Sequence, residues 1–465
     1  MKPVVALIGR PNVGKSTLFN CLTRKRTAIV IDLPGVTRDR QIGDGALGDR
    51  AYYVMDTGGV GTLPEGAPLE LIEAAVRQTE QAIAEADVLL FVTDARQGLL
   101  PADREVAQQL RRTGKPLTVV VNKTEGLDPS VAVADFHSLG LGEPIPVSAS
   151  HGIGVEAMIS SVLAPWLPAE EGAETQDEAD LRIAVIGRPN AGKSTLVNTL
   201  LGEDRMVVSP HPGTTRDSIR IPFERGPHRY VLIDTAGLRR RSKISEAVER
   251  ISVVQTLRAI DEASVVILLL DAIEGVVDQD ASIAGYALEQ GRPVVIAVNK
   301  WDALDAEQRD WARREVDRKL ITFLPFSPVH YISAENGQGL EPLLRSCRQA
   351  HASAGIELPT AQLNRVLEKA IEAHSPPVVR GRRIRIKFAH QTGRFPPRIV
   401  LHGNQVAALP DEYRRYLTNR IRQVFRLVAT PLSIQTEEGE NPYARPGAAQ
   451  SRKKRTARTK KGKKR

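Results

Sequence analysis

The sequence predicts an α/β protein: two successive domains with parallel-rich sheets covered by helices on both faces, then a smaller α+β domain. Three observations predict it. A glycine-rich segment occurs twice, as Gly9–Thr17 and Gly187–Thr195, each time directly after an apolar run. Apolar runs alternate with helical patterns after each copy. From Pro359 onward the chain becomes basic and the order of elements changes.

The repeated segment has the chemistry of a phosphate-binding loop. It matches G-x-x-x-x-G-K-[ST] at the end of a predicted strand and the start of a predicted helix. Its glycines let backbone N–H groups surround phosphate, its lysine adds a cation, and its serine hydroxyl can ligate Mg²⁺. We therefore expect two nucleoside triphosphate sites, formed by Gly9, Asn12, Gly14, Lys15, Ser16 and Thr17 and by Gly187, Asn190, Gly192, Lys193, Ser194 and Thr195.

Length and composition narrow the class of protein. The 465 residues suffice for about three domains, and no apolar run is long enough to span a membrane. The first loop follows Met1 so closely that no removable signal is expected before it. Cys21 and Cys347 lie too far apart in sequence to indicate a zinc site or a disulfide framework. A cytoplasmic setting is expected.

The net charge of +9 is unevenly distributed along the chain. Residues 1–358 carry −9, residues 359–437 carry +9, and residues 451–465 carry ten Lys or Arg and no acid. This pattern favours a polyanion-binding C-terminal part. For the last segment, a solvated disordered run is the alternative.

Within residues 1–165, predicted helices alternate with predicted strands. The helices cover residues 16–22, 69–86 and 103–112, and the strands cover residues 52–56, 88–94, 117–121 and 145–147. Polar motifs follow most of the strands, where ligands bind in open α/β sheets.

Register shows that this domain is duplicated. Thr37 lies 22 residues after Lys15, and Asp56 lies 41 residues after it. Thr215 and Asp234 lie at the same distances from Lys193, a constant offset of 178. Residues 181–353 are the expected second domain. Residues 166–180, rich in acids, proline and glycine, are the expected linker.

The order of motifs resembles the Ras-like GTPase superfamily, which implies GTP or GDP with Mg²⁺ as ligands. By that resemblance, Thr37 and Gly59, with Thr215 and Gly237, respond to the γ-phosphate. Ser16, Thr37 and Asp56 hold Mg²⁺ in the first domain, as do Ser194, Thr215 and Asp234 in the second. Guanine is read by Asn122, Lys123, Glu125, Ser148 and Ala149 in the first domain and by Asn299, Lys300, Asp302, Ser333 and Ala334 in the second.

Two positions depart from the superfamily pattern. Glu125 replaces the aspartate of the Asn-Lys-x-Asp motif, and its extra methylene predicts weaker guanine binding at the first site. Asp128 is a less suitable substitute. Val60 and Leu238 stand where many relatives have a glutamine that orients water, so slow intrinsic hydrolysis is expected.

Two further features leave alternatives open. Asn12 and Asn190 resemble the asparagines of GTPases that K⁺ activates; alternatively, they only stabilise the loop turn. The basic run at residues 238–243 can contact RNA or fold over acidic surface, or is a solvated loop.

After Pro359 the pattern predicts helix, two strands, helix and strand, at residues 363–374, 383–389, 398–402, 413–425 and 432–435. This order resembles a KH-type RNA-binding fold, without the G-x-x-G loop that clamps single strands. The expected KH-like domain covers residues 354–437, and a basic disordered tail covers residues 438–465.

Two P-loop GTPase domains followed by a KH-like domain resemble the Der, or EngA, family of double-Era-like GTPases. The resemblance also rests on His402–Gln405 and Glu440–Tyr443. It implies a monomeric GTPase switch in assembly of the large (50S) ribosomal subunit, binding rRNA and ribosomal proteins. The alternative is a regulatory scaffold whose partner is a protein or membrane surface. An ATPase is disfavoured because Asn299, Lys300 and Asp302 form a guanine-reading motif.

Overall fold

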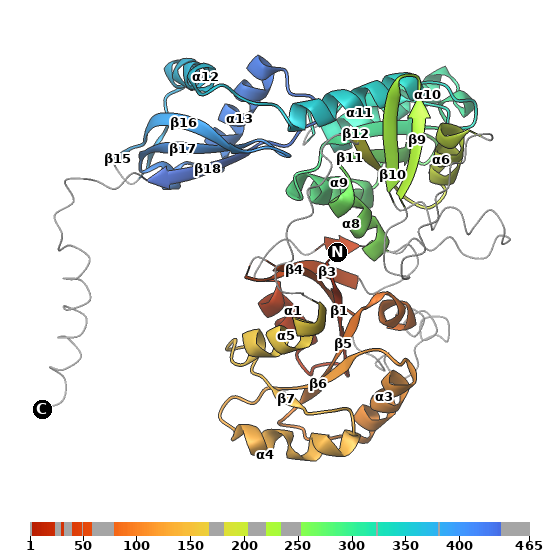
Figure 1. The fold of residues 1–465 in the computed structure, drawn as a ribbon, viewed down its shortest axis with the longest axis vertical. Helices are drawn as coiled ribbons and strands as arrows, with labels where there is room; N and C mark the ends of the chain where they lie inside the picture. Colours follow the sequence, from red (N-terminus) through yellow and green to blue (C-terminus); the bar gives the residue numbers. More distant parts are fainter. Residues whose placement is uncertain are drawn as a thin grey trace, which may run out of the picture. The chain divides into compact units, whose positions relative to one another are not determined.

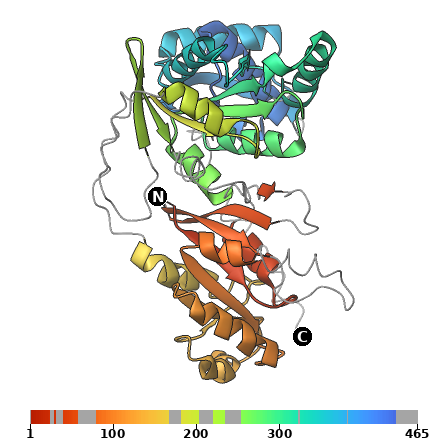
Figure 2. The ribbon, with the colours of Figure 1, turned by 90° about the vertical axis from the view of Figure 1, so that its right-hand side faces the viewer.

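The computed structural model describes residues 2–23, 29–31, 40–48, 50–57, 79–166, 181–202, 220–233, 253–321, 324–379 and 382–438. The chain divides into two compact units, residues 1–348 and 349–465. Figures 1 and 2 show the ribbon from two directions.

The first sheet has the order β2-β3-β4-β1-β5-β6-β7. Its strands are β1 (Val4–Ile8), β2 (Ile29–Ile31), β3 (Arg40–Leu47), β4 (Arg50–Asp56), β5 (Val88–Asp94), β6 (Leu117–Asn122) and β7 (Ile145–Pro146). β3 runs antiparallel to β2 and β4, and the other pairings are parallel. Every residue of β1 and β5 is buried, as expected for parallel strands covered on both faces.

Helices lie on both faces of this sheet (Figures 1 and 2). They are α1 (Lys15–Leu22), α3 (Pro101–Arg112), α4 (Pro129–Val133) and α5 (Val155–Leu163), with 3₁₀ turns at Ala134–Leu139 and Ala164–Trp166. Alternate residues of β1 enter opposite cores: Val4 packs in the cluster that contains Leu110 of α3, and Val5 in the cluster that contains Ile159 of α5. This alternation fixes β1 in the middle of the domain.

The second sheet repeats this plan. Its order β9-β10-β8-β11-β12-β13 reproduces β3-β4-β1-β5-β6-β7, which confirms the duplication predicted from register. The strands are β8 (Leu181–Ile186), β9 (Arg220–Arg225), β10 (His228–Ile233), β11 (Val265–Asp271), β12 (Val294–Asn299) and β13 (Val329–Tyr331). Its helices are α6 (Lys193–Leu201), α8 (Val253–Glu262), α9 (Asp278–Glu289), α10 (Ala306–Val316) and α11 (Leu340–Ala354), with a 3₁₀ turn at Trp301–Ala303 and a π-helical turn at Asp317–Ile321.

The C-terminal unit contains the predicted order of two helices and three strands, plus a short hairpin. Its elements are α12 (Thr360–Ala373), β14 (Val378–Val379), β15 (Arg382–Arg383), β16 (Arg385–Gly393), β17 (Arg398–Asn404), a 3₁₀ turn (Val406–Ala408), α13 (Asp411–Phe425) and β18 (Ser433–Glu438). β17 pairs antiparallel with β16 and parallel with β18. Leu363, Leu417 and Ile421 of the helices pack with Ala389 and Leu401 of the sheet in one core.

Several expectations fall partly or wholly outside the described residues. Of the helix expected at 69–86, residues 79–85 are described and are helical. Nearly all of the expected linker, most of the tail and the basic run after Gly237 lie outside. No described helix has both the length and the apolar composition needed to cross a bilayer.

Candidate functional site

The polar motifs meet at the carboxyl ends of the parallel strands. In the first domain, β1 leads into the phosphate loop, β4 ends at Asp56, β5 at Asp94 and β6 at Asn122. The second domain repeats this edge, with β11 ending at Asp271 and β12 at Asn299. The strand order therefore brings together residues that lie far apart in sequence.

The loop glycines are required by close contacts. A Cβ on Gly9 would lie 2.2 Å from the carbonyl oxygen of Val92, and one on Gly187 would lie 2.2 Å from that of Leu269. Gly14 adopts φ 97°, which is favourable only for glycine. These positions hold the loop against the β5 and β11 backbones.

The loop lysines lie folded back onto the loop. Lys15 Nζ donates to the carbonyl oxygens of Gly9 at 3.0 Å and Arg10 at 2.7 Å. Lys193 Nζ makes the corresponding bonds to Gly187, at 3.0 Å, and Arg188. Both lysines are buried, so each ammonium is held inside the loop that would enclose phosphate.

A serine hydroxyl and a carboxylate lie together beside the first loop. Ser16 Oγ donates to Asp56 Oδ2 at 2.8 Å. Asp56 is buried, and Thr57 fixes the end of β4 by donating to Leu7 O at 2.8 Å. The pair supplies oxygen donors of the kind that Mg²⁺ prefers.

Asn122 and Asn299 join two loops in the same way in each domain. Asn122 Nδ2 donates to Val13 O at 2.9 Å, and its Oδ1 accepts from Ala149 N at 3.0 Å. Asn299 repeats both bonds at 2.9 Å, with Ala191 O and Ala334 N. An amide suits this position because its Nδ2 donates to one loop while its Oδ1 accepts from the other.

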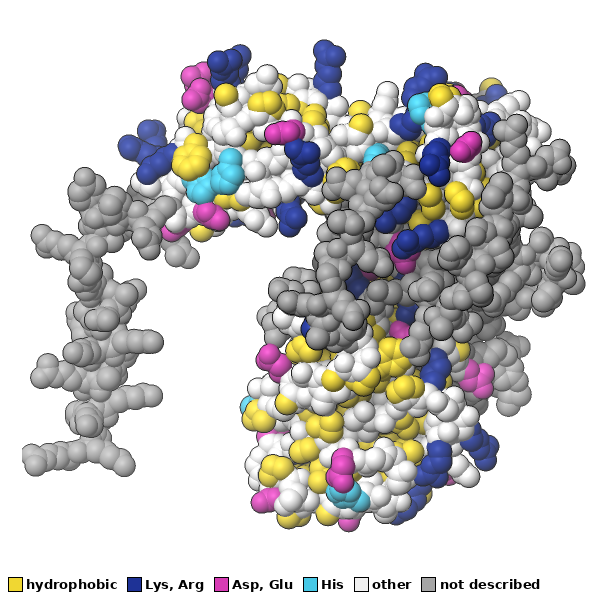
Figure 3. Space-filling view, viewed as in Figure 1, with side chains coloured by type: hydrophobic (Ala, Val, Ile, Leu, Met, Phe, Trp, Pro, Cys, Tyr) yellow, Lys and Arg dark blue, Asp and Glu magenta, His cyan; other side chains and the backbone are white. Residues whose placement is uncertain are grey.

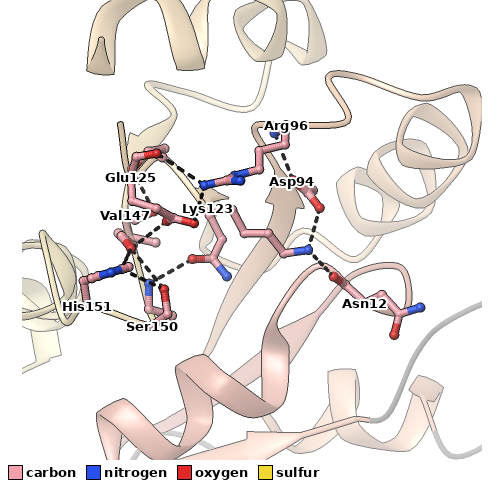
Figure 4. A network of polar contacts seen from close by, with 12 residues as sticks. Asn12, Asp94, Arg96, Lys123, Glu125, Val147, Ser150 and His151 are labelled. Carbon is pink, nitrogen blue, oxygen red and sulfur yellow. Dashed lines mark hydrogen bonds and ion pairs between the residues drawn. The ribbon is translucent and has the colours of Figure 1, made fainter. Parts of the chain in front are cut away.

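The adjacent lysines are held by buried aspartates. Lys123 Nζ lies 2.7 Å from Asp94 Oδ2 and donates to Asn12 O at 2.6 Å (Figure 4). Lys300 Nζ lies 2.6 Å from Asp271 Oδ2. Sequence reasoning missed these aspartates. Their position 28 residues before the asparagine in both domains was the available signal.

The two sites differ at the acidic residue of the guanine motif, which is Glu125 in the first domain and Asp302 in the second. Glu125 Oε2 accepts from Ser148 Oγ at 2.7 Å, and Glu125 Oε1 pairs with Arg96 Nη2 at 2.9 Å (Figure 4). The hydrogen bond from Ser148 is the main cause that holds the pKa of the Glu125 carboxyl below its usual range, with Arg96 contributing. Glu125 is therefore an anion held by its neighbours, in contact with both the Ser148 loop and the end of β5.

The second site has a different partner for its acid. Asp302 Oδ2 accepts from Asn336 Nδ2 at 3.0 Å, and Ile273 occupies the place that corresponds to Arg96. Asn336 also donates its backbone N–H to Ser333 Oγ at 3.2 Å. Arg96 and Asn336 were both missed by sequence reasoning, because neither belongs to the repeated motifs.

Thr17, Ser194 and Thr195 lie in the first turn of α1 or α6, and Gly192 directly precedes α6. The other predicted site residues fall into two groups. Asn12 and Asn190 both adopt φ 61°, a left-handed conformation that asparagine tolerates better than most residues. The other group lies outside the described residues and comprises Thr37, Gly59, Thr215, Asp234 and Gly237.

Fold and site together define a class: two P-loop GTPase domains in tandem, joined to a KH-like domain. The chain matches the 50S ribosome-binding GTPase family over residues 4–123 and again over 182–300. Residues 357–436 match the KH-domain-like C-terminal part of EngA bacterial GTPases. It is 52% identical to GTPase Der of Thioalkalivibrio sulfidiphilus over 96% of this chain and 95% of that protein. The corresponding values for GTPase Der of Hahella chejuensis are 51%, 96% and 93%. The chain belongs to the Der, or EngA, family and is a GTPase with two G domains.

Among solved structures, Era in complex with MgGDPNP and a segment of 16S ribosomal RNA aligns at 22% identity with a TM-score of 0.32. That alignment covers 68% of this chain and 98% of Era.

Proposed function

We propose that this GTPase is a switch that acts in the cytoplasm, as a monomer, in maturation of the large ribosomal subunit. It would bind rRNA and ribosomal proteins in a nucleotide-dependent way. The observation that carries the proposal is that one chain combines two guanine motifs, each held in place by its asparagine (Asn122 or Asn299), with a basic KH-like unit. Residues 359–437 of that unit carry a net charge of +9. The description of the family that both G domains match, 50S ribosome-binding GTPase, supports the same partner.

We assign the following roles at each site. Lys15 and Lys193 bind the β- and γ-phosphates, and Asn122, Lys123, Ser148 and Ala149, with their counterparts in the second domain, frame guanine. Asp302 and Glu125 accept hydrogen bonds from the guanine ring. Thr37 with Gly59, and Thr215 with Gly237, respond to the γ-phosphate.

The first site fits Mg²⁺ by its donor set. Ser16 Oγ and Asp56 Oδ2, 2.8 Å apart, would bind the ion directly and through water, and the corresponding residues are Ser194 and Asp234. An Mg²⁺ ion held there would neutralise charge that develops on the phosphates. Asn12 and Asn190 are the proposed K⁺ ligands, and their role in the loop turn is the competing account.

Nucleotide-dependent sedimentation tests the proposal. The full chain is centrifuged with purified large subunits in GDP, GTP or a non-hydrolysable GTP analogue, across a salt series. A chain ending at Gln450 measures the contribution of the last segment, and Lys15→Ala and Lys193→Ala show which site controls binding. Binding to the large subunit only with the analogue supports the switch.

The opposite result would be binding that changes with neither nucleotide nor salt concentration. Because contacts to phosphates weaken as salt rises, that result would favour a GTPase whose partner is a protein or membrane surface.

A further inference from the structure

One face of the C-terminal sheet packs on the helices of this unit, and the other face, which we call the open face, carries several exposed side chains although Val400 on it is buried. Ala389, Ile399 and Leu401 are fully buried in the core that contains α12 and α13. Side chains alternate along a strand, so Phe388 and His390 of β16 and His402 of β17 lie on the opposite face. We call these three rings the stacking platform. Register places Phe388 directly across from His402.

The rings of the platform are ordered with respect to one another. Phe388 lies over His402 with ring centroids 4.4 Å apart and planes 13° apart. His390 Nδ1 and His402 Nε2 are 3.2 Å apart, within hydrogen-bonding distance, and their planes differ by 14°. His402 therefore covers one face of the phenylalanine ring, and His390 in turn contacts His402.

Phe388 is nevertheless open to solvent. Its exposed fraction is 47%, and Trp311 is the only other exposed aromatic side chain in the described part of the chain. A bulge between Ile386 and Phe388 leaves Lys387 without a partner on β17, beside the ring. Bulges commonly redirect side chains at functional surfaces.

Cations surround the platform. Arg385, Lys387 and Arg398 are exposed, and alternation places Arg385 and Arg398 on the open face. None of the three forms an ion pair with a described carboxylate. Glu437 is the acid that faces the rings from β18, with its Oε2 3.6 Å from His402 Nδ1. Figure 3 shows histidine and hydrophobic atoms side by side on this unit, with Lys or Arg atoms close by.

An exposed, ordered aromatic ring beside cations fits one partner chemistry. Aromatic rings stack on unpaired bases at about 1–3 kcal/mol per base, while Lys and Arg bind the flanking phosphates. We propose that the platform binds an unpaired base of RNA on the face of Phe388, with Lys387, Arg385 and Arg398 at the backbone. This inference rests on the proposed RNA-binding function and names the surface that performs it, in a unit without a G-x-x-G clamp.

Binding of a fluorescent single-stranded oligoadenylate to the full chain tests the platform, with the same strand in a duplex as reference. Phe388→Leu keeps the apolar volume but removes the aromatic face, and we expect it to weaken binding roughly five- to hundredfold. The salt slope should stay unchanged in this variant. Lys387→Gln should reduce the slope by about 1, because it removes one phosphate contact. Val424→Ala, which trims another exposed apolar side chain of the same unit, is the matched control and should bind as wild type.

A spectroscopic variant provides a positive signal. Phe388→Trp should keep the affinity, and its added fluorescence should be quenched when the oligoadenylate stacks on it. Equal affinities for Phe388→Leu and wild type, or no quenching at saturation, would overturn the proposal.

Sedimentation separates this inference from the ribosomal function. Wild-type binding to large subunits together with normal oligoadenylate binding by Phe388→Leu would refute the platform alone. Failure of wild type to bind subunits, with a clear effect of Phe388→Leu on the oligoadenylate, would refute the ribosomal role alone.

Discussion

Ser148 donates a 2.7 Å hydrogen bond from its Oγ to Oε2 of Glu125, across the gap between the loops that follow β7 and β6. The same carboxylate is paired with Arg96 at 2.9 Å. Asp302 in the second site has neither partner and instead accepts from Asn336. The duplicated domains thus share the contacts of the asparagine and the lysine. They differ in the side chains that contact the acidic residue, Glu125 or Asp302.

Glu125→Asp should increase GDP affinity at the first site, roughly three- to tenfold, up to about 1.4 kcal/mol. Removing the extra methylene moves the carboxylate away from Arg96 and gives the side chain the same length as that of Asp302 in the second site. Fluorescent GDP titration in a Lys193→Ala background isolates the first site. Asp302→Glu in a Lys15→Ala background is the reverse control and should weaken binding. Unchanged affinity in both would show that the length of this side chain does not matter.

Asp94→Ala should destabilise the first domain by about 1–3 kcal/mol, because it leaves the Lys123 ammonium without its buried partner. Asp94 is 2% exposed and also accepts from Arg96 N at 2.9 Å. Urea unfolding measures the loss. The control is Asp310→Ala, which breaks an exposed pair with Arg313 and should change stability by less than about 1 kcal/mol. Similar effects for the two variants would contradict the structural role of Asp94.

Cys347 should resist alkylation in the folded protein. Burial raises the pKa of its thiol from 9.0 to about 12, so it stays protonated at pH 8, and the thiolate is the reactive form. Iodoacetamide should label Cys21, which is only partly buried, and should reach Cys347 only after unfolding. In a Cys21→Ser variant, rapid native labelling would contradict this account.

The same shift has a stability consequence with a definite sign. Between pH 9 and about 12 the unfolded thiol ionises while the folded thiol stays neutral, so its contribution to stability is full below pH 9 and falls as pH rises.

GTP hydrolysis should be faster in K⁺ than in Na⁺ if the loop asparagines ligate the ion. Asn190→Gly separates the two accounts, because glycine keeps the φ of 61° but lacks the side-chain oxygen. We expect this variant, in a Lys15→Ala background that leaves only the second site, to lose the K⁺ effect while retaining GDP binding. Equal rates in both salts for wild type would leave only the turn-stabilising role.

Much of the fold was predictable from local pattern. The buried strands β1, β5 and β11 are largely apolar runs, and the constant offset between motifs required a repeated topology. The αββαβ order of the C-terminal unit followed from a change between helical and alternating periodicity. The short β14–β15 hairpin was missed because two-residue strands carry almost no periodicity.

The site residues that belong to motifs with a fixed spacing in the sequence, such as Asn122 and Lys123, were predictable. Arg96 and Asn336 were not, because each reaches the frame from a different loop and has no counterpart in the other domain. The stacking platform was also missed. It depends on the cross-strand register of Phe388 and His402, which the sequence of either strand alone does not reveal.

We propose that one chain holds two guanine nucleotide sites of the same design, one in each G domain, and that Glu125 lowers the affinity of the first. Calorimetric titration with GDP of wild type, Lys15→Ala and Lys193→Ala tests it most directly. We predict two GDP molecules per wild-type chain with unequal affinities, and one in each variant, the tighter in Lys15→Ala. A single GDP per wild-type chain, or equal affinities in the two variants, would contradict the claim.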